Sequence, residues 1–198
     1  MIKLSILIPS IPSRNEKMVA LFNKINSQIL WTDVEILCFV DNKKRSIGFK
    51  RDALVQMANG KYLTFIDDDD NVSDNYISLI LDAIDNSNNP DVICFKIACS
   101  MNSGNIFIVD HDISYENEES RIVDGKWVDV KRKPLHNSVW KSSLAKSENF
   151  PDASYGEDSH WSKRLHPKVK SSYKIDNVLS HYRWDKDITE AELTFPKD

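Results

Sequence analysis

The sequence predicts an α/β protein with a mainly parallel central sheet flanked by helices and a smaller mixed or antiparallel back half. In the first half, strand-like and helix-like segments alternate, which is typical of a parallel sheet. In the second half, short strand-like segments follow one another with turns between them. The 198 residues are 41% hydrophobic and 28% charged, which is typical of one soluble domain with a core. We therefore expect a single domain over 1–198, divided into halves 1–90 and 91–198.

Hydrophobic periodicity defines the elements of the first half. Ser13 and Glu16 fit a capping box, and the apolar residues after it recur at helical spacing through Ile29. The expected elements, in order, are a strand at 3–8, that helix, a strand at 35–40, a helix at 51–59 closed by Gly60, a strand at 62–66 and a helix around 76–84.

The second half reads as hairpins and one further helix. "DVICFKIA" and "NIFIV" flank a short polar turn, which predicts an antiparallel hairpin. "RIVDGKWVDV" predicts a second strand pair around Asp124 and Gly125. A short helix is expected at 158–165, and "SYKIDNVLSHYRW" is a final extended segment.

Charge and cysteine content exclude some classes of protein. A net charge of −4 makes nucleic acid an unlikely partner. Cys38, Cys94 and Cys99 are odd in number and lack metal-site spacing, so we expect reduced core thiols in a cytoplasmic protein. No segment approaches the roughly 18 apolar residues of a spanning helix. Any membrane association would therefore be peripheral, at the inner face.

Four consecutive aspartates, Asp67 to Asp70, follow the third strand. Ligands of open α/β sheets bind beyond the carboxyl ends of the parallel strands. Two charges about 4 Å apart repel by roughly 4 kcal/mol at an effective dielectric of 20, and a divalent cation removes that repulsion. Mg²⁺ is commonly held by one or two carboxylates plus substrate phosphates. The alternative is a solvated turn in which Asp70 or Ser73 caps the next helix.

Glu157 and Asp158 stand at the start of a predicted helix, after Gly156. They could simply complement the helix dipole, or one of them could act as a general base. His181 could be structural or could contact a metal or a phosphate. His136, Trp140 and Trp161 could line an acceptor pocket, although the two tryptophans could equally be core residues.

Together these motifs resemble the family 2 glycosyltransferases. "LSILIPSIPSR" is similar to the family's first strand and nucleotide-base loop, and "VEILCFVDN" is similar to its second strand. "IGFKRDALVQMANGKYLTFIDDDD" resembles the basic helix followed by a D-x-D motif, and "FPDASYGEDSHWSKRL" resembles the segment that carries the base. The resemblance spans residues 3–184 and implies the GT-A fold.

The resemblance also implies a role for each half and for individual residues. Residues 1–90 would bind the nucleotide and 91–198 the acceptor. Asp158 would be the catalytic base with Glu157 beside it, and Mn²⁺ or Mg²⁺ would be held by Asp69, Asp67 and His181. The residues expected to bind a nucleotide-sugar donor are Pro9, Ser10, Arg14, Asp41, Lys50, Arg51, Asp67 and Asp68.

The implied reaction is the metal-dependent, inverting transfer of a sugar to a glycan or another hydroxyl acceptor. A UDP-sugar is the expected donor. Asp41 is followed by Asn42, and Arg51 by Asp52, where the family commonly has Asp and Asn. Two other functions remain open: a non-catalytic module that binds nucleotide-sugars or glycans, and a sugar-phosphate nucleotidyltransferase. The latter usually has a Gly-rich loop after its first strand, and "PSIPSR" is not one.

Overall fold

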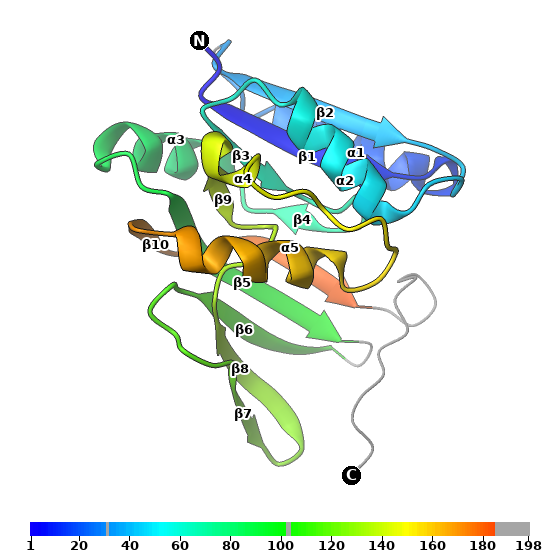
Figure 1. The fold of residues 1–198 in the computed structure, drawn as a ribbon. Coiled ribbons are helices and arrows are strands. Elements are labelled where there is room, and N and C mark those ends of the chain that lie inside the picture. Colours follow the sequence, from blue (N-terminus) through cyan, green and yellow to red (C-terminus); the bar gives the residue numbers. More distant parts are fainter. Residues whose placement is uncertain (31, 102–103, 185–198) are drawn as a thin grey trace.

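The protein folds as an α/β domain in a computed structural model that describes residues 1–30, 32–101 and 104–184. Its strands form one mixed sheet in the order β2-β1-β3-β9-β5-β6-β8-β7, and β10 pairs with β5 and β4 (Figure 1). The strands are β1 (Leu4–Ser10), β2 (Val34–Val40), β3 (Tyr62–Phe65), β4 (Asn71–Val72), β5 (Val92–Met101), β6 (Asn105–His111), β7 (Glu119–Val123), β8 (Lys126–Arg132), β9 (Val139–Lys141) and β10 (Ser172–Trp184). The α-helices are α1 (Asn15–Asn26), α2 (Ile47–Met57), α3 (Tyr76–Asn86), α4 (Ser142–Ala145) and α5 (Glu157–Leu165).

Strand β1 lies between β2 and β3 and pairs with both in parallel. All seven of its residues are buried, because a strand covered by helices on both faces needs no polar face. By contrast, β2 is an edge strand that is only partly buried. Cys38 on β2 is exposed, whereas Cys94 and Cys99 are buried. This corrects the expectation that all three thiols lie in the core.

Two hydrophobic clusters cover the two faces of the sheet. One contains residues of α1 and α3, such as Ile25 and Ile80, packed on β1, β5 and β10. The other contains residues of α2 and α5, such as Leu54 and Trp161, packed on β3 and β5. Helices of the first half therefore cover one face, and an early and a late helix together cover the other.

Two helix starts differ from the sequence prediction, and one capping alternative for a third helix is excluded. A 3-10 turn at Pro12–Arg14 precedes α1, and no side chain caps that helix, so the capping box predicted at Ser13 is wrong. Helix α2 begins at Ile47, earlier than expected, because Ser46 Oγ accepts the backbone N–H of Phe49 at 3.0 Å. Helix α3 begins after Asn75 with no side-chain cap. The alternative in which Asp70 or Ser73 caps that helix is therefore excluded.

The back half confirms the two hairpins and adds two short elements. Strands β5 and β6 pair antiparallel, as do β7 and β8 around Asp124 and Gly125, which both have positive φ. Strand β9 and helix α4 were not predicted, because segments of three or four residues carry no periodic signal. Strand β10 runs parallel to β5 and antiparallel to β4, with His181 opposite Asn71. The end of β10 therefore lies next to the acidic run.

Gly48 lets α2 approach the segment that leads into α5. Its backbone N–H donates to the carbonyl of Ala153 at 2.9 Å. A Cβ atom built on Gly48 would lie 1.9 Å from the carbonyl oxygen of Pro151, far inside van der Waals contact. Any side chain here would push residues 151–153 away from the helix.

No helix in the described part of the chain is long and apolar enough to cross a membrane.

Candidate active site

The parallel strands β1, β2 and β3 bring three polar segments to one edge of the sheet. Ser10 ends β1, Asp41 follows β2, and Asp67 follows β3 after one residue. Asp41 N–H donates to the Ser10 carbonyl at 3.4 Å, and the Ser10 hydroxyl donates to Asp68 at 2.7 Å. The sequence prediction that these segments share one crevice is therefore confirmed by their contacts.

The acidic run is a tight turn in which Asp70 N–H donates to the carbonyl of Asp67 at 3.0 Å. Arg14 Nη1 lies 2.9 Å from Asp68 and 3.2 Å from Asp69. Arg51 Nη2 lies 2.9 Å from Asp67. One oxygen of Asp70 is buried without a hydrogen-bond partner among the described residues. Two arginines thus face a run of four acids.

The pKa directions within the run separate Asp67 from its neighbours. Burial favours the neutral form of Asp67, but Arg51 and His136 outweigh it and hold the pKa of Asp67 well below its usual range. Burial raises the pKa of Asp69, and Asp67 and Asp68 add to the rise while Arg14 opposes it. The pKa of Asp70 is raised well above normal by burial and by Asp67 and Asp69. Negative charge in this turn is therefore incompletely balanced.

Those acids fit a hard divalent cation. The orphaned, buried Asp70 oxygen and the raised pKa values of Asp69 and Asp70 mark carboxylates that a cation would stabilise. However, no group of three His, Cys, Asp or Glu side chains among the described residues is arranged to hold a metal by itself. The expected metal ligands Asp67, Asp69 and His181 are therefore not preassembled among the described residues, and their role stays a prediction. One or two carboxylates acting with ligand phosphates remain compatible with the structure.

Arg51 connects three elements beneath the acidic turn. It is 3% exposed, and its Nε lies 3.1 Å from Glu157 Oε1. Its guanidinium also lies over the ring of Phe65, 5.3 Å from the centroid. Burial raises the pKa of Glu157 despite the charge of Arg51. Arg51 and Glu157 therefore form a buried ion pair beneath the acidic turn.

Asp158 is more accessible than Glu157. It occupies the first turn of α5, which follows Gly156 in the left-handed conformation at φ 72°. Its side chain is 27% exposed, and Oδ2 lies 3.2 Å from Nδ1 of His136. Burial raises the pKa of Asp158, but His136 and Arg51 outweigh it and bring the pKa well below normal. Asp158 is therefore an ionised, partly exposed carboxylate next to His136.

On the other side, a lysine ties β1 to β2. Lys50 Nζ donates to the Ser10 carbonyl at 3.0 Å and lies 3.3 Å from Asp41. Asp41 also accepts the backbone N–H of Arg45 at 3.0 Å. Pro9 is buried in β1, opposite Phe39. The residues predicted to bind a donor, from Pro9 to Asp68, thus lie in one connected network.

The predicted acceptor residues are placed differently. Trp140 and Trp161 are both fully buried, with ring centroids 5.5 Å apart. Their indole N–H groups donate to the carbonyls of Leu135 and Glu148. Neither ring offers a surface to a ligand, so the acceptor role is corrected to a core role. His136 is 8% exposed and lies at the acidic cluster.

A cleft of about 870 Å³ opens on the α1 side of the acidic turn. It is lined by Lys17 and Lys24 of α1, by Asp68 to Asp74, by the ends of β5 and β6, and by His181 to Arg183 of β10. His181 is exposed in this cleft. Sequence reasoning missed both the cleft and the position of Asp70, since helix α1 and strand β10 are far apart in the sequence. The acidic run itself was the only signal.

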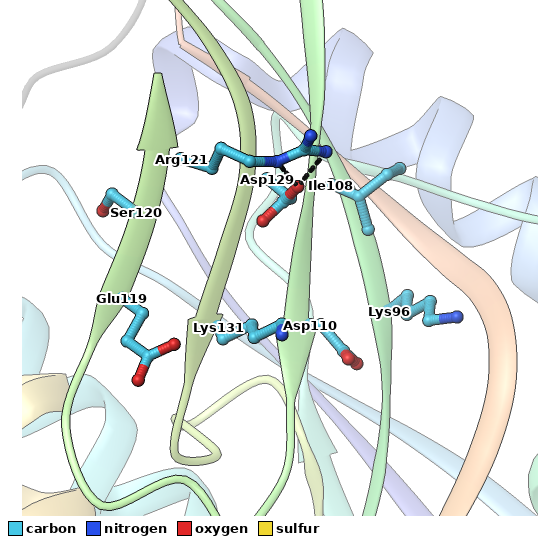
Figure 2. A pocket seen from close by; sticks show the side chains of 8 residues that line it. All are labelled: Lys96, Ile108, Asp110, Glu119, Ser120, Arg121, Asp129 and Lys131. Atoms are coloured by element: carbon cyan, nitrogen blue, oxygen red, sulfur yellow. Dashed lines mark hydrogen bonds and ion pairs between the residues drawn. The ribbon is translucent and has the colours of Figure 1, made fainter. Parts of the chain in front are cut away.

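A second groove, of about 510 Å³, lies on the β5-β6-β8-β7 sheet and shares no residue with the acidic run. Figure 2 shows charged side chains of both signs along it, with Arg121 paired to Asp129. Lys96 pairs with Asp176, and Asp110 with Lys174. Most of its charges are therefore satisfied within the protein.

Parallel strands that end in a polar crevice define the class as an α/β protein of nucleotide-binding type. The particular family follows from the sequence, because residues 33–138, more than half of the chain, match the family described as glycosyl transferase family 2. The chain belongs to this family. No curated protein matches the sequence.

Solved structures agree on the fold. S. aureus TarS 1-349 in complex with UDP-GlcNAc has a TM-score of 0.69 and 15% identity, with 93% of this chain and 59% of that one covered. The complex of the same TarS 1-349 with UDP has a TM-score of 0.68 and 15% identity, with 92% and 61% covered. A further S. aureus TarS structure has a TM-score of 0.67 and 13% identity, with 92% and 37% covered. The chain thus spans less than two thirds of these proteins, and the predicted GT-A fold is confirmed.

Proposed function

We propose that this protein is a metal-dependent, inverting glycosyltransferase that moves a sugar from a nucleotide-diphosphate sugar to a hydroxyl acceptor. The carrying observation is that Asp158, ionised and partly exposed, lies close to the acidic run, with His136 between it and Asp67. Membership of family 2 supports the reaction class. The complexes of TarS with UDP-GlcNAc and UDP support a UDP-sugar as the first donor to test.

Donor binding is assigned to the network at the ends of β1, β2 and β3. Asp41 and the Pro9–Ser10 backbone would receive the base, and the contacts of Lys50 with Asp41 and the Ser10 carbonyl support this by holding the two segments together. Arg14 holds Asp68 and Asp69, so that it orders the turn that faces the diphosphate. Arg51 sets Asp67 from below instead of contacting the nucleotide directly. Residues 1–90 would therefore act as the donor half.

A divalent cation is assigned to Asp69, with Asp67 or Asp70 as a second carboxylate. When bound, Mn²⁺ or Mg²⁺ would neutralise charge on the departing diphosphate. The protein contributes an ordered, acidic turn, in which Asp69 and Asp70 both favour a nearby positive charge. His181, across the strand pair from Asn71, is a candidate for a phosphate or metal contact from the same cleft.

Asp158 is assigned as the general base. Its carboxylate takes the proton of the acceptor hydroxyl while that oxygen forms a bond to the anomeric carbon. The bond from that carbon to the diphosphate oxygen breaks, and its electron pair leaves with the nucleotide. Attack from the face opposite the leaving group inverts the configuration, and no covalent enzyme intermediate is needed. Glu157 supports this step through Arg51.

Residues 91–198 would provide the acceptor side, because α5 and its two acids lie there. A glycan or another hydroxyl compound is the proposed acceptor. The free cysteines support a reducing, cytoplasmic setting, with contact at the inner membrane face as the alternative.

The test is a screen of UDP-, GDP- and dTDP-sugars with Mn²⁺, read first by thermal shift and then by release of nucleoside diphosphate with acceptor panels. The proposal predicts stabilisation by one class of donor and release that depends on acceptor. Release of pyrophosphate from a nucleoside triphosphate and a sugar phosphate would point instead to a nucleotidyltransferase. Donor binding without transfer across all acceptors and metals would point to a binding module.

A further inference from the structure

His136 lies in the segment between β8 and β9, and backbone contacts hold this segment against the end of β3. Its carbonyl accepts the N–H of Phe65 at 3.4 Å, which ties it to the end of β3. The next carbonyl, that of Asn137, accepts the hydroxyl of Thr64 at 3.1 Å. One residue earlier, the Leu135 carbonyl accepts the indole of Trp140 at 2.8 Å. Three consecutive residues are thus anchored, and the His136 backbone has little freedom.

The imidazole lies between two carboxylates from different elements. Nδ1 is 3.2 Å from Asp158 Oδ2 at the start of α5. Nε2 is 3.9 Å from Asp67 Oδ2 at the end of β3. The side chain is 10% exposed, and its ring lies 6.1 Å from the ring of Phe65. Each ring nitrogen therefore faces one acid, and little of the ring is left for an acceptor to touch.

The position of His136 matters because it separates two carboxylates that repel each other. Asp67 and Asp158 are close enough to disfavour each other's charge, so that without a group between them they would turn apart. Arg51 holds Asp67 from one side, but no arginine or lysine within ion-pair distance of Asp158 is found among the described residues. His136 is the side chain that occupies the space between the two acids, and it adds to the backbone N–H of Ser159, which donates to the other oxygen of Asp158 at 2.7 Å.

We infer that His136 is a positioning residue, which holds the base Asp158 and the donor-side acid Asp67 at a fixed separation across the crevice. The inference rests on the proposed function, since it gives the two acids roles on opposite sides of one reaction. It reassigns His136 from acceptor contact to a link between the donor turn and the base. The ring acts by occupying the space between the two acids: Nδ1 lies 3.2 Å from Asp158 without hydrogen-bond geometry, and Nε2 lies 3.9 Å from Asp67.

Two amide substitutions at His136 test the contact with Asp158 and the contact with Asp67 separately. In His136→Asn, the amide nitrogen can occupy the place of Nδ1 near Asp158, and nothing replaces Nε2. In His136→Gln, the amide nitrogen can reach the place of Nε2 near Asp67, and nothing replaces Nδ1. His136→Phe keeps the ring and loses both nitrogens. Each variant is compared with wild type in melting temperature, in kcat, and in KM for the donor.

The expected results differ between the variants. His136→Phe should lose about 10²-fold in kcat, as for a misplaced catalytic group. His136→Asn should keep kcat within about fivefold but raise the donor KM about tenfold, and His136→Gln should show the reverse. In the double variant with Asp158→Asn, the loss from His136→Phe should shrink to less than about threefold, because residues that act as a unit are not additive. Equal losses in all three variants, or kinetics of His136→Phe near wild type, would overturn the inference.

A structural readout keeps this inference separate from the proposed function. In a crystal structure of His136→Phe, the Asp158 carboxylate should leave its wild-type position, and in His136→Asn it should stay. An unmoved Asp158 in the Phe variant rejects the positioning role even if the enzyme is active. Conversely, a wild type that transfers no sugar rejects the proposed reaction, while the position of Asp158 still decides whether His136 fixes it.

Discussion

Arg51 and Asp67 form an ion pair at 2.9 Å, in which the arginine side chain is 4% exposed and the aspartate side chain 26% exposed. The same arginine also forms an ion pair with the buried Glu157 at 3.1 Å, so one cation pairs with two acids from different elements. A buried pair of this kind is costly to break, because the partner that remains keeps its charge without water or a counter-ion. The first prediction concerns this pair.

Replacing Arg51 with Met should lower the free energy of unfolding by about 3–5 kcal/mol, since Asp67 and Glu157 would be left without their cation. The measurement is urea unfolding at pH 7. Arg121→Met is the matched control, because Arg121 makes an ion pair with Asp129 but its side chain is 64% exposed. That control should change stability by less than about 1 kcal/mol. Similar losses in the two variants would show that Arg51 does not hold the site together.

Asp158→Asn should reduce kcat by about 10²–10⁴, the usual contribution of a general base. The amide keeps an oxygen that can accept the Ser159 N–H, as Asp158 does at 2.7 Å, so donor affinity should stay within about twofold of wild type by calorimetry. Asp124→Asn, in the turn between β7 and β8, is the control and should leave kcat unchanged. Since the pKa of Asp158 is lowered, its protonation should not reduce the rate between pH 8 and pH 5. Transfer near wild type in Asp158→Asn would remove Asp158 from the mechanism.

Mn²⁺ together with UDP or a UDP-sugar at about 100 times its Kd should stabilise the protein by about 2.7 kcal/mol. For a domain of this size the corresponding rise in Tm is about 5–10 °C. EDTA or Asp69→Asn should abolish the metal-dependent part of this shift. Asp74→Asn, whose side chain is 96% exposed, should retain it. Because the pKa of Asp69 is raised by burial and its acidic neighbours, Asp69→Asn without ligand should be at least as stable as wild type. A shift that persists in Asp69→Asn would argue against a metal on this turn.

Buried His111 should make the protein sensitive to acid. Burial, with the charges of Arg132, His136, Lys174 and His166, lowers the pKa of His111 to about 3, below the roughly 6.5 of an unfolded histidine. The unfolded chain therefore binds this proton first. Stability from His111 is complete above pH 6.5 and is lost as the pH falls toward 3, by at most about 1.4 kcal/mol per pH unit.

His111→Phe tests this pH dependence. Neither ring nitrogen of His111 has a hydrogen-bond partner among the described residues, so the substitution should cost little at pH 7. Unfolding curves between pH 7 and pH 4 should show a flatter acid limb for His111→Phe than for wild type. His160→Gln replaces an exposed histidine of α5 and should leave the limb as it is. An unchanged slope in His111→Phe would place the acid sensitivity elsewhere.

Sequence patterns predicted the parallel strands and the edge at which their polar ends meet. The buried run 4–10 and the acidic run after Phe65 are local signals. Because parallel strands end at one edge of a sheet, these signals predicted that their polar ends lie together. The pattern at 35–40 was read as a buried strand, yet β2 is an edge, because the order of strands is not written in the hydrophobicity of any one of them.

Side-chain partners were harder to predict than elements. Arg51 was expected at the nucleotide and is buried against Glu157, a residue 106 positions later in the chain. Trp140 and Trp161 could line an acceptor pocket or lie in the core on sequence grounds, and they pack against each other in the core. In each case the residue type was informative, while its partner depended on contacts between distant segments. His136 is the clearest example, since a lone histidine before "NSVW" gives no sign of the two acids that flank it.

Gly48 gives the two halves of the candidate site a common reference point. Because Gly48 has no side chain, α2 can lie close to residues 151–153, and this contact fixes where the segment that leads to Asp158 begins. Under the proposed role of Asp158, the same contact sets the distance of its carboxylate from the acceptor. A directed-evolution library of this protein should therefore find this position almost closed to change. Variants that alter the width of the crevice will arise more readily in residues 151–156 than in α2.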